Sequence, residues 1–189
     1  MRKLKVFLAA VLAFAAIGRP VPATTVVALD DAQLVRLAKT IVHADVIGKQ
    51  SYVAGPSGRI YTEYAFRPRE VLKGEAGKDG LVIFREWGGE VNGIHYWLPG
   101  VGAFSEGEEF IGFLGEADPQ NGVSFTTGLA QGKFHIDRDA QGNARAVRNM
   151  GELHLVDPKT GQVEDGAPRR AVSVDLSALK EMIRTNLAK

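Results

Sequence analysis

The chain of 189 residues contains no cysteine. This absence excludes disulfides, thiol catalysis, Cys-ligated zinc and iron–sulfur clusters, so the fold must be stabilised by its hydrophobic core. The four histidines, His43, His95, His135 and His154, are dispersed, and none has the spacing of a local zinc-binding pair. The sequence therefore predicts neither a metal site nor a cofactor.

Common motifs of catalysis and phosphate binding are missing as well. The sequence has no G-x-S-x-G or S-x-x-K serine motif and no G-x-x-x-x-G-K-[ST] phosphate loop. At Lys73-Gly74 the lysine precedes the glycine, and the nearby Glu70 and Glu75 do not supply the cationic neighbour that activates a lysine. We interpret this pair as a corner of a β-sheet with a solvated lysine.

The first 23 residues have the features of a secretory signal peptide. Residues 1–5 are basic, residues 6–18 form an apolar run of 13 residues, and Val21 and Ala23 suit cleavage after Ala23. The run is shorter than the ~20 apolar residues of a membrane span, which disfavours the alternative of a retained anchor. We expect a secreted or periplasmic bacterial protein without membrane insertion after cleavage.

Removal of residues 1–23 would change the sign of the net charge. That segment holds four basic and no acidic side chains, so 19 basic and 22 acidic side chains remain, a formal charge of −3. A mildly acidic chain without a basic stripe argues against nucleic acid as a partner. Residues 24–189 are long enough for a single domain with a real core.

Hydrophobic periodicity predicts a helix followed by strands. Residues 29–44 have helical spacing, with Asp30 or Asp31 as a possible cap and a strand expected from Asp45. Residues 51–53 and 60–67 flank a Gly/Pro turn and predict a hairpin, and Pro68 indicates a sheet edge or a bulge. Further short strands are expected at 81–84 and 110–114. The apolar positions of the predicted helix are Leu34, Leu37, Ala38 and Ile41.

The last third of the chain contains a weak repeat. Phe134-His135-Ile136 recurs 19 residues later as Leu153-His154-Leu155, and a glycine turn follows each. We interpret both as hairpins, in which His135 and His154 could approach each other. A C-terminal helix is expected from about Asp175, a possible cap, to Leu187, with a buried stripe of Leu176, Leu179, Ile183 and Leu187. Strands followed by a terminal helix predict a mostly β (α+β) fold.

Three short motifs resemble a known superfamily. Residues 44–48 (ADVIG), 64–74 (YAFRPREVLKG) and 107–114 (GEEFIGFL) resemble the pattern of the netrin/TIMP-like OB-fold superfamily and of uncharacterised secreted bacterial proteins with that pattern. The resemblance implies an OB-like five-stranded barrel over about 44–115, with residues 116–189 as a hairpin and helix extension. TIMP-type inhibitors reach a protease's zinc through an N-terminal cysteine, so that mechanism is not carried over.

Two acidic segments are candidates for chemistry, but each has a simpler interpretation. Residues 137–143 begin like a calcium loop, yet Arg148 occupies the position of the acidic bidentate ligand, so a polar hairpin turn is expected. Glu108 and Glu109 are consecutive and would face opposite sides of a strand, which disfavours a glycosidase pair.

The aromatic, glycine-rich segment 87–102 is the best candidate for a binding site. Aromatic side chains on a loop can form a contact surface, although Trp87, Ile94 and Trp97 could instead cover an open barrel end. The candidate binding residues are Trp87, Asn92, His95, Tyr96 and Trp97.

Two functional hypotheses follow, beside the plainer possibility of a structural envelope protein with no soluble ligand. The first is an exported, non-enzymatic binding domain that recognises an extracellular protein, such as a protease, through this loop. The alternative is a small exported hydrolase whose acid and base residues meet only in the fold. Its candidate residues are Glu90, His95, Glu108 and His135.

Overall fold

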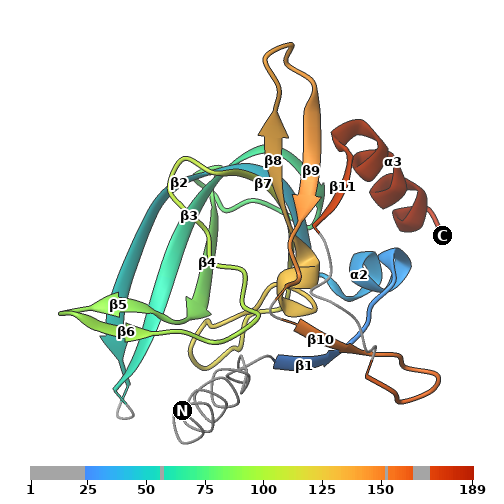
Figure 1. Ribbon diagram of the computed structural model, residues 1–189. Coiled ribbons are helices and arrows are strands. Elements are labelled where there is room, and N and C mark those ends of the chain that lie inside the picture. Colours follow the sequence, from blue (N-terminus) through green and yellow to red (C-terminus); the bar gives the residue numbers. More distant parts are fainter. Residues whose placement is uncertain (1–23, 56–57, 152, 164–170) are drawn as a thin grey trace, which may run out of the picture.

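The computed structural model describes residues 24–55, 58–151, 153–163 and 171–189, and the expected signal peptide lies outside them. The described chain is mostly β, with one large antiparallel sheet and two α-helices, as predicted (Figure 1). The helices are α2 (Asp31–Leu37) and α3 (Leu176–Leu187), and a 3-10 turn covers Leu129–Gly132. The strands are β1 (Thr24–Val27), β2 (Thr40–Ala54), β3 (Arg59–Lys73), β4 (Val82–Trp87), β5 (Gly89–Val91), β6 (Ile94–Tyr96), β7 (Glu109–Leu114), β8 (Lys133–Arg138), β9 (Ala144–Arg148), β10 (Leu153–Val156) and β11 (Val172–Asp175).

Seven strands form the main sheet in the order β11-β9-β8-β7-β2-β3-β4, and every neighbouring pair is antiparallel. Among the described residues, β11 and β4 are the two edges, so the sheet does not close into a barrel. The mostly β class is thus confirmed, whereas an OB-like barrel stays a prediction. Two smaller sheets pair β1 with β10 in parallel and β5 with β6 antiparallel.

Strands β2 and β3 are 15 residues long each, and bulges bend them. Their pairing shifts register at three places, one of which lies between His43 and Ala44, where Pro68 is the partner of Ala44. Proline has no N–H to donate to a ladder and is tolerated where a bulge interrupts the pairing. The sequence-based prediction of an edge or bulge at Pro68 is confirmed as a bulge.

Helix α2 is shorter than the predicted range of 29–44. Asp30 caps its N-terminus: its carboxylate accepts from the Gln33 N–H at 2.7 Å, and the Gln33 side chain accepts from the Asp30 N–H at 2.9 Å. The helix ends at Leu37, which is 54% exposed, and β2 begins at Thr40. Ile41 matched the helical period, but it is a buried strand residue. The C-terminal part of the helix prediction is therefore wrong.

Lys73 and Gly74 form a corner at the end of β3. Gly74 has φ +78°, and a Cβ there would lie 2.8 Å from Thr40 Oγ1 and 3.0 Å from the Lys39 carbonyl oxygen, so glycine is required. Lys73 is not simply solvated, as the sequence had suggested. Its Nζ donates hydrogen bonds to backbone carbonyls of the last turn of α2, including that of Val35 at 2.8 Å. The pair is structural.

Two buried clusters form the main core on the sheet. In one, α2 and α3 pack side by side against the sheet (Figure 1), and the predicted C-terminal helix buries Leu179 and Ile183 there, whereas Leu187 is 39% exposed. Asp175 caps α3 by accepting from the Ser177 N–H at 2.8 Å, as predicted. The other cluster is aromatic and contains Tyr64, Phe66, Phe84, Phe104 and Phe110.

The C-terminal repeat folds in two different ways. β8 and β9 form the predicted hairpin, and Asp139 in its turn accepts from the backbone N–H groups of Gln141 and Asn143, as a polar turn does. β10 also pairs in parallel with β1. Of the second predicted hairpin, the described residues show the turn, in which the Asp157 N–H donates to the Gln162 carbonyl, and an antiparallel bridge between Val156 and Val163, whereas residues 164–170 lie outside them. His135 and His154 therefore belong to different sheets.

Among the residues that the structure describes, no helix is long and apolar enough to cross a membrane.

Candidate functional site

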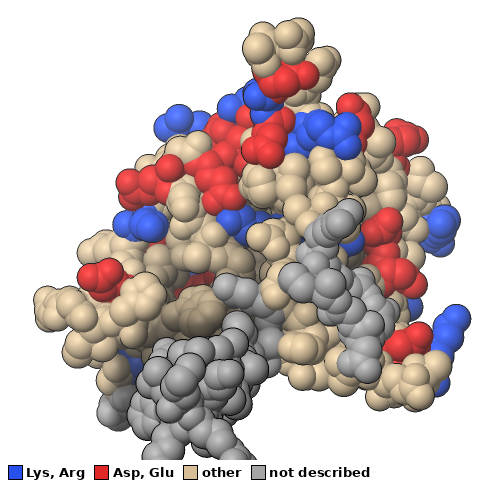
Figure 2. All heavy atoms as spheres, viewed as in Figure 1, with Lys and Arg blue, Asp and Glu red and all other residues tan. Residues whose placement is uncertain are grey.

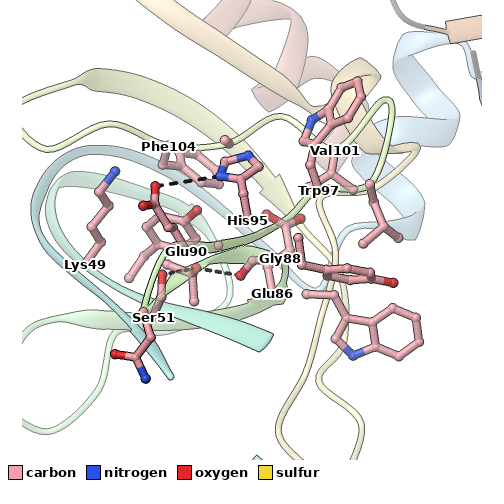
Figure 3. Close-up of a pocket in the computed structure, with 17 residues that line it drawn as sticks. Lys49, Ser51, Glu86, Gly88, Glu90, His95, Trp97, Val101 and Phe104 are labelled. Carbon is pink, nitrogen blue, oxygen red and sulfur yellow. Dashed lines mark hydrogen bonds and ion pairs between the residues drawn. The ribbon is translucent and has the colours of Figure 1, made fainter. Parts of the chain in front are cut away.

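The residues of the aromatic segment line a cleft of about 510 Å³ at one end of the curved sheet (Figure 3). Strands β2, β3 and β4 form its floor. The β5–β6 hairpin and the segment 97–104 form its roof. Its volume lies within the range of roughly 300–1,000 Å³ that small-molecule sites occupy.

The floor is a row of polar side chains that strand register places side by side. Thr62 on β3 is the partner of Ser51 on β2 and of Glu86 on β4, so all three point to one face. The Ser51 and Thr62 hydroxyl oxygens are 2.8 Å apart, and Thr62 donates to the Gly88 carbonyl at 2.7 Å. In the next row, Lys49 is paired with Tyr64. The floor thus joins polar groups to the aromatic core.

The roof depends on a tight hairpin turn and on close backbone packing. Asn92 and Gly93 have φ of +52° and +76°, the left-handed conformation at both positions that an Asn-Gly hairpin turn adopts. Gly89 also has a positive φ, and a Cβ there would collide with the hydroxyl oxygens of Thr62 and Ser51. Glycine at position 89 therefore lets β5 lie directly on the floor.

All five candidate binding residues line this one cleft. Tyr96 and Trp97 are 43% and 46% exposed, and Ile94 beside them is 65% exposed, so they do not act as a buried cover. Trp87 is only partly accessible: its ring packs edge-on against Phe125, with centroids 5.3 Å apart. The tip of the β5–β6 hairpin is mostly uncharged (Figure 2, lower left). The exposed roof therefore offers aromatic side chains beside the Glu90–His95 pair.

Glu86 is the unusual member of the floor. It is 1% exposed, and its Oε1 atom has no hydrogen-bond partner among the described residues. Burial raises the pKa of Glu86 to about 8, although a backbone hydrogen bond from Thr126 and the positive charge of Lys133 act in the opposite direction. At neutral pH the carboxyl group is therefore mainly protonated, uncharged and able to donate a hydrogen bond.

Lys133 fixes the segment that closes the cleft at Phe104. Its ammonium group pairs with Glu108 at 2.8 Å, donates to the Ala103 carbonyl and lies 4.5 Å from the centre of the Phe104 ring. Burial lowers the pKa of Lys133, and the nearby Glu108 opposes this. Glu108 is thus committed to a structural ion pair.

The four residues of the hydrolase hypothesis do not meet in one place. Glu90 and His95 are cross-strand partners in the roof, and both side chains are well exposed. His95 Nδ1 lies 3.8 Å from Glu90 Oε2. His135 instead faces a shallow depression that Glu108 and Glu109 also line, and it lies 3.4 Å from Asp137. Only Glu90 and His95 share the cleft.

A second cluster of charges lies where β2, β7 and β8 meet. Glu109 accepts hydrogen bonds from His43 at 2.8 Å and from Arg138 at 2.6 Å. Although burial opposes it, these bonds and the charge of Arg69 lower the pKa of Glu109 to about 2. Burial lowers the pKa of His43, which is therefore neutral at pH 7. Every charge here is paired, so the cluster serves the fold. Within the described ranges, no group of three or more His, Asp or Glu residues could hold a metal.

Sequence reasoning missed the floor of the cleft, although two signals could have found parts of it. Period-two alternation places Glu86 on the same face as the buried Val82 and Phe84. The Asn92-Gly93 pair is a strong hairpin signal inside the segment that was interpreted as a loop. The Gly/Pro turn correctly predicted the hairpin of β2 with β3, but the pairing of β3 with β4 had no such signal. The missed lining residues are Lys49, Ser51, Thr62, Tyr64, Glu86 and Phe104.

Comparison of the chain with protein-family models, with curated proteins and with solved structures gives no significant match.

Proposed function

We propose that the protein is an exported, non-enzymatic binding domain and that the cleft is its binding site. One observation carries this proposal: Tyr96 and Trp97 are nearly half exposed on the rim of a cleft whose floor is polar. Exposed aromatic residues beside a concave site are costly to leave in water and supply much of the energy of binding interfaces. The partner would be a molecule outside the cytoplasm, and an extracellular protein such as a protease is one candidate.

A capture experiment tests this proposal. The purified protein, immobilised, is exposed to an envelope or culture-supernatant extract of the producing cells, in parallel with Trp97→Ala and with Ile83→Ala. Ile83 is 55% exposed on β4 and does not line the cleft, so it controls for loss of an exposed apolar side chain. We expect Trp97→Ala to weaken capture at least about tenfold, the loss of a strong interface residue. Equal capture by all three proteins would refute the cleft as the interface.

The hydrolase alternative rests on the Glu90–His95 pair and on Glu86 in the same cleft. A protonated buried carboxyl and an exposed carboxylate are the kinds of group that acid–base catalysis uses. Turnover of fluorogenic ester, peptide or glycoside substrates that disappears in Glu90→Gln would favour this alternative over simple binding.

We also propose an OB-like relationship for β7-β2-β3-β4, the neighbouring strands of the main sheet that lie largely within the expected core of 44–115. The support is their antiparallel order and the bulges that bend β2 and β3, since bulges provide the curvature that a barrel needs. An experimental structure in which these strands are flat and unrelated to a barrel would refute it.

A further inference from the structure

The chemistry of the cleft narrows the class of ligand, if the cleft is the binding site that we propose. Its polar groups include donors and acceptors in close succession. Lys49 donates, Glu90 accepts, and Asn92 does both, while the buried Glu86 adds a carboxyl group at the floor. A ligand that matches them must itself carry several groups that both donate and accept.

The charges in the cleft balance. Lys49 is positive and Glu90 is negative, and the Glu86 carboxyl is mainly uncharged at neutral pH because burial raises its pKa to about 8. An anionic ligand would meet Glu90 and oppose the ionisation of Glu86, and a cationic ligand would meet Lys49. The electrostatics therefore favour an uncharged ligand.

The rim requires a flat apolar surface on the same ligand. Tyr96 and Trp97 are nearly half exposed and line the cleft together with its polar groups, and Figure 3 shows Trp97 near the Glu90–His95 pair. A purely apolar ligand would leave the polar groups of the cleft without partners, which costs free energy. A pyranose ring combines hydroxyls around its edge with an apolar C–H face.

We infer that the cleft binds a neutral saccharide unit, with its apolar face against Trp97 and its hydroxyls toward Glu90, Asn92 and Lys49. This inference rests on the proposed binding function and specifies it further. The partner is then a glycan or a glycan-bearing molecule outside the cytoplasm. The cleft, at about 510 Å³, has room for such a ligand without rearrangement of the sheet.

The test uses an array of immobilised neutral, acidic and amino-sugar oligosaccharides, followed by titration of the best neutral compound monitored by tryptophan fluorescence. We expect the protein to bind neutral oligosaccharides, and Trp97→Ala to weaken that binding at least about tenfold. Tyr96→Ala is a second variant at the rim, and Ile83→Ala is the control outside the cleft. Glu90→Gln keeps hydrogen-bonding capacity and removes the charge, so it should have a smaller effect than Trp97→Ala.

The outcomes separate this inference from the proposed function. Preference for acidic or amino sugars, or neutral binding that survives both Trp97→Ala and Tyr96→Ala, overturns the inference. If no oligosaccharide binds but Trp97-dependent capture from the extract persists, the saccharide inference fails and the binding function stands. If neither form of binding is observed, both fail. A loss in Glu90→Gln larger than that in Trp97→Ala would indicate a cationic ligand and would also overturn the inference.

Discussion

Lys73 donates a hydrogen bond to the carbonyl oxygen of Ala38, and this contact links the end of β3 to the end of α2. The same ammonium group donates to the carbonyls of Val35 and Arg36 at 2.8 and 3.1 Å. The last carbonyls of a helix have no intrahelical partner and carry partial negative charge, so a lysine placed there both caps them and complements the helix dipole. A seven-residue helix is too short to be stable without such contacts.

Replacement of Lys73 by Met should therefore destabilise the protein. Methionine keeps much of the apolar stem but leaves three carbonyls without their charged donor, for an expected loss of about 1–3 kcal/mol in the free energy of unfolding. Urea unfolding measures this loss. Lys78→Met, at an exposed loop position, is the matched control and should change stability by less than about 0.5 kcal/mol. Equal effects of the two changes would contradict the capping role.

The role of Lys73 also shows the limits of prediction from sequence. The motif around Lys73-Gly74 correctly indicated a corner and excluded a phosphate loop. It could not show that the lysine reaches α2, because the two lie 35 residues or more apart and meet only through the pairing of β2 with β3. Local signals such as the Asp30 and Asp175 caps and the hairpin turns were readable because each depends on neighbours in sequence.

The cleft shows the same division between local and long-range information. Its aromatic roof was found from composition, since Trp87, Tyr96 and Trp97 lie within one short segment. Its floor depends on the register between β2, β3 and β4, which brings Ser51, Thr62 and Glu86 into one row. A sequence gives period-two alternation for each strand, but it does not say which residues become cross-strand partners.

Gly89→Ala should distort the cleft more than it destabilises the protein elsewhere. A Cβ at position 89 would collide with the hydroxyls of Ser51 and Thr62, so the β5–β6 hairpin must move off the floor. Gly107 also has a positive φ but has open space around it, so Gly107→Ala adds only backbone strain of about 1 kcal/mol. We expect Gly89→Ala, and not Gly107→Ala, to lose binding in the capture and array experiments. Retained binding in Gly89→Ala would show that the close contact of hairpin and floor is dispensable.

Glu109→Gln should reduce stability at neutral pH and remove part of the acid sensitivity. The pKa of Glu109 in the folded protein is lowered to about 2 from an ordinary value of 4.5, so its stabilising effect is present above pH 4.5 and is lost as the pH falls toward 2. The variant should be less stable by about 1–3 kcal/mol at pH 7, because it loses ion pairs with Arg138 and Arg69.

Unfolding by urea at pH 7, 4 and 2.5 checks this expectation for Glu109. The difference from the unmodified protein should shrink as the pH falls. Glu116→Gln is the matched control, since its side chain is 78% exposed and pairs with Lys39 at 3.5 Å. Such surface pairs contribute roughly 0–1 kcal/mol. A constant difference at all three pH values would mean that the neighbours of Glu109 do not lower its pKa in the folded protein.

Glu86→Gln should have the opposite pH dependence. Burial raises the pKa of Glu86 to about 8 in the folded protein, so between pH 4.5 and 8 the folded state binds this proton more tightly than the unfolded state does. The contribution of the Glu86 proton to the free energy of unfolding is therefore fully present below about pH 4.5 and decreases as the pH rises toward 8. Glutamine has a similar shape and does not titrate, so the variant should equal the unmodified protein near pH 5. At pH 8.5 the free energy of unfolding of the variant should be higher than that of the unmodified protein by at least about 1.4 kcal/mol.

Urea unfolding of both proteins at pH 5, 7 and 8.5 measures this gain, with Glu181→Gln at an exposed position of α3 as the control that should show no such trend. A variant that gains nothing at high pH would mean that Glu86 is ionised in the fold, through solvent or a partner that reaches its Oε1 atom. The charge balance of the cleft would then change from neutral to negative, and a cationic ligand would become the better match. The pH profile of Glu86→Gln therefore tests, without any ligand, the electrostatic premise on which a neutral saccharide is inferred.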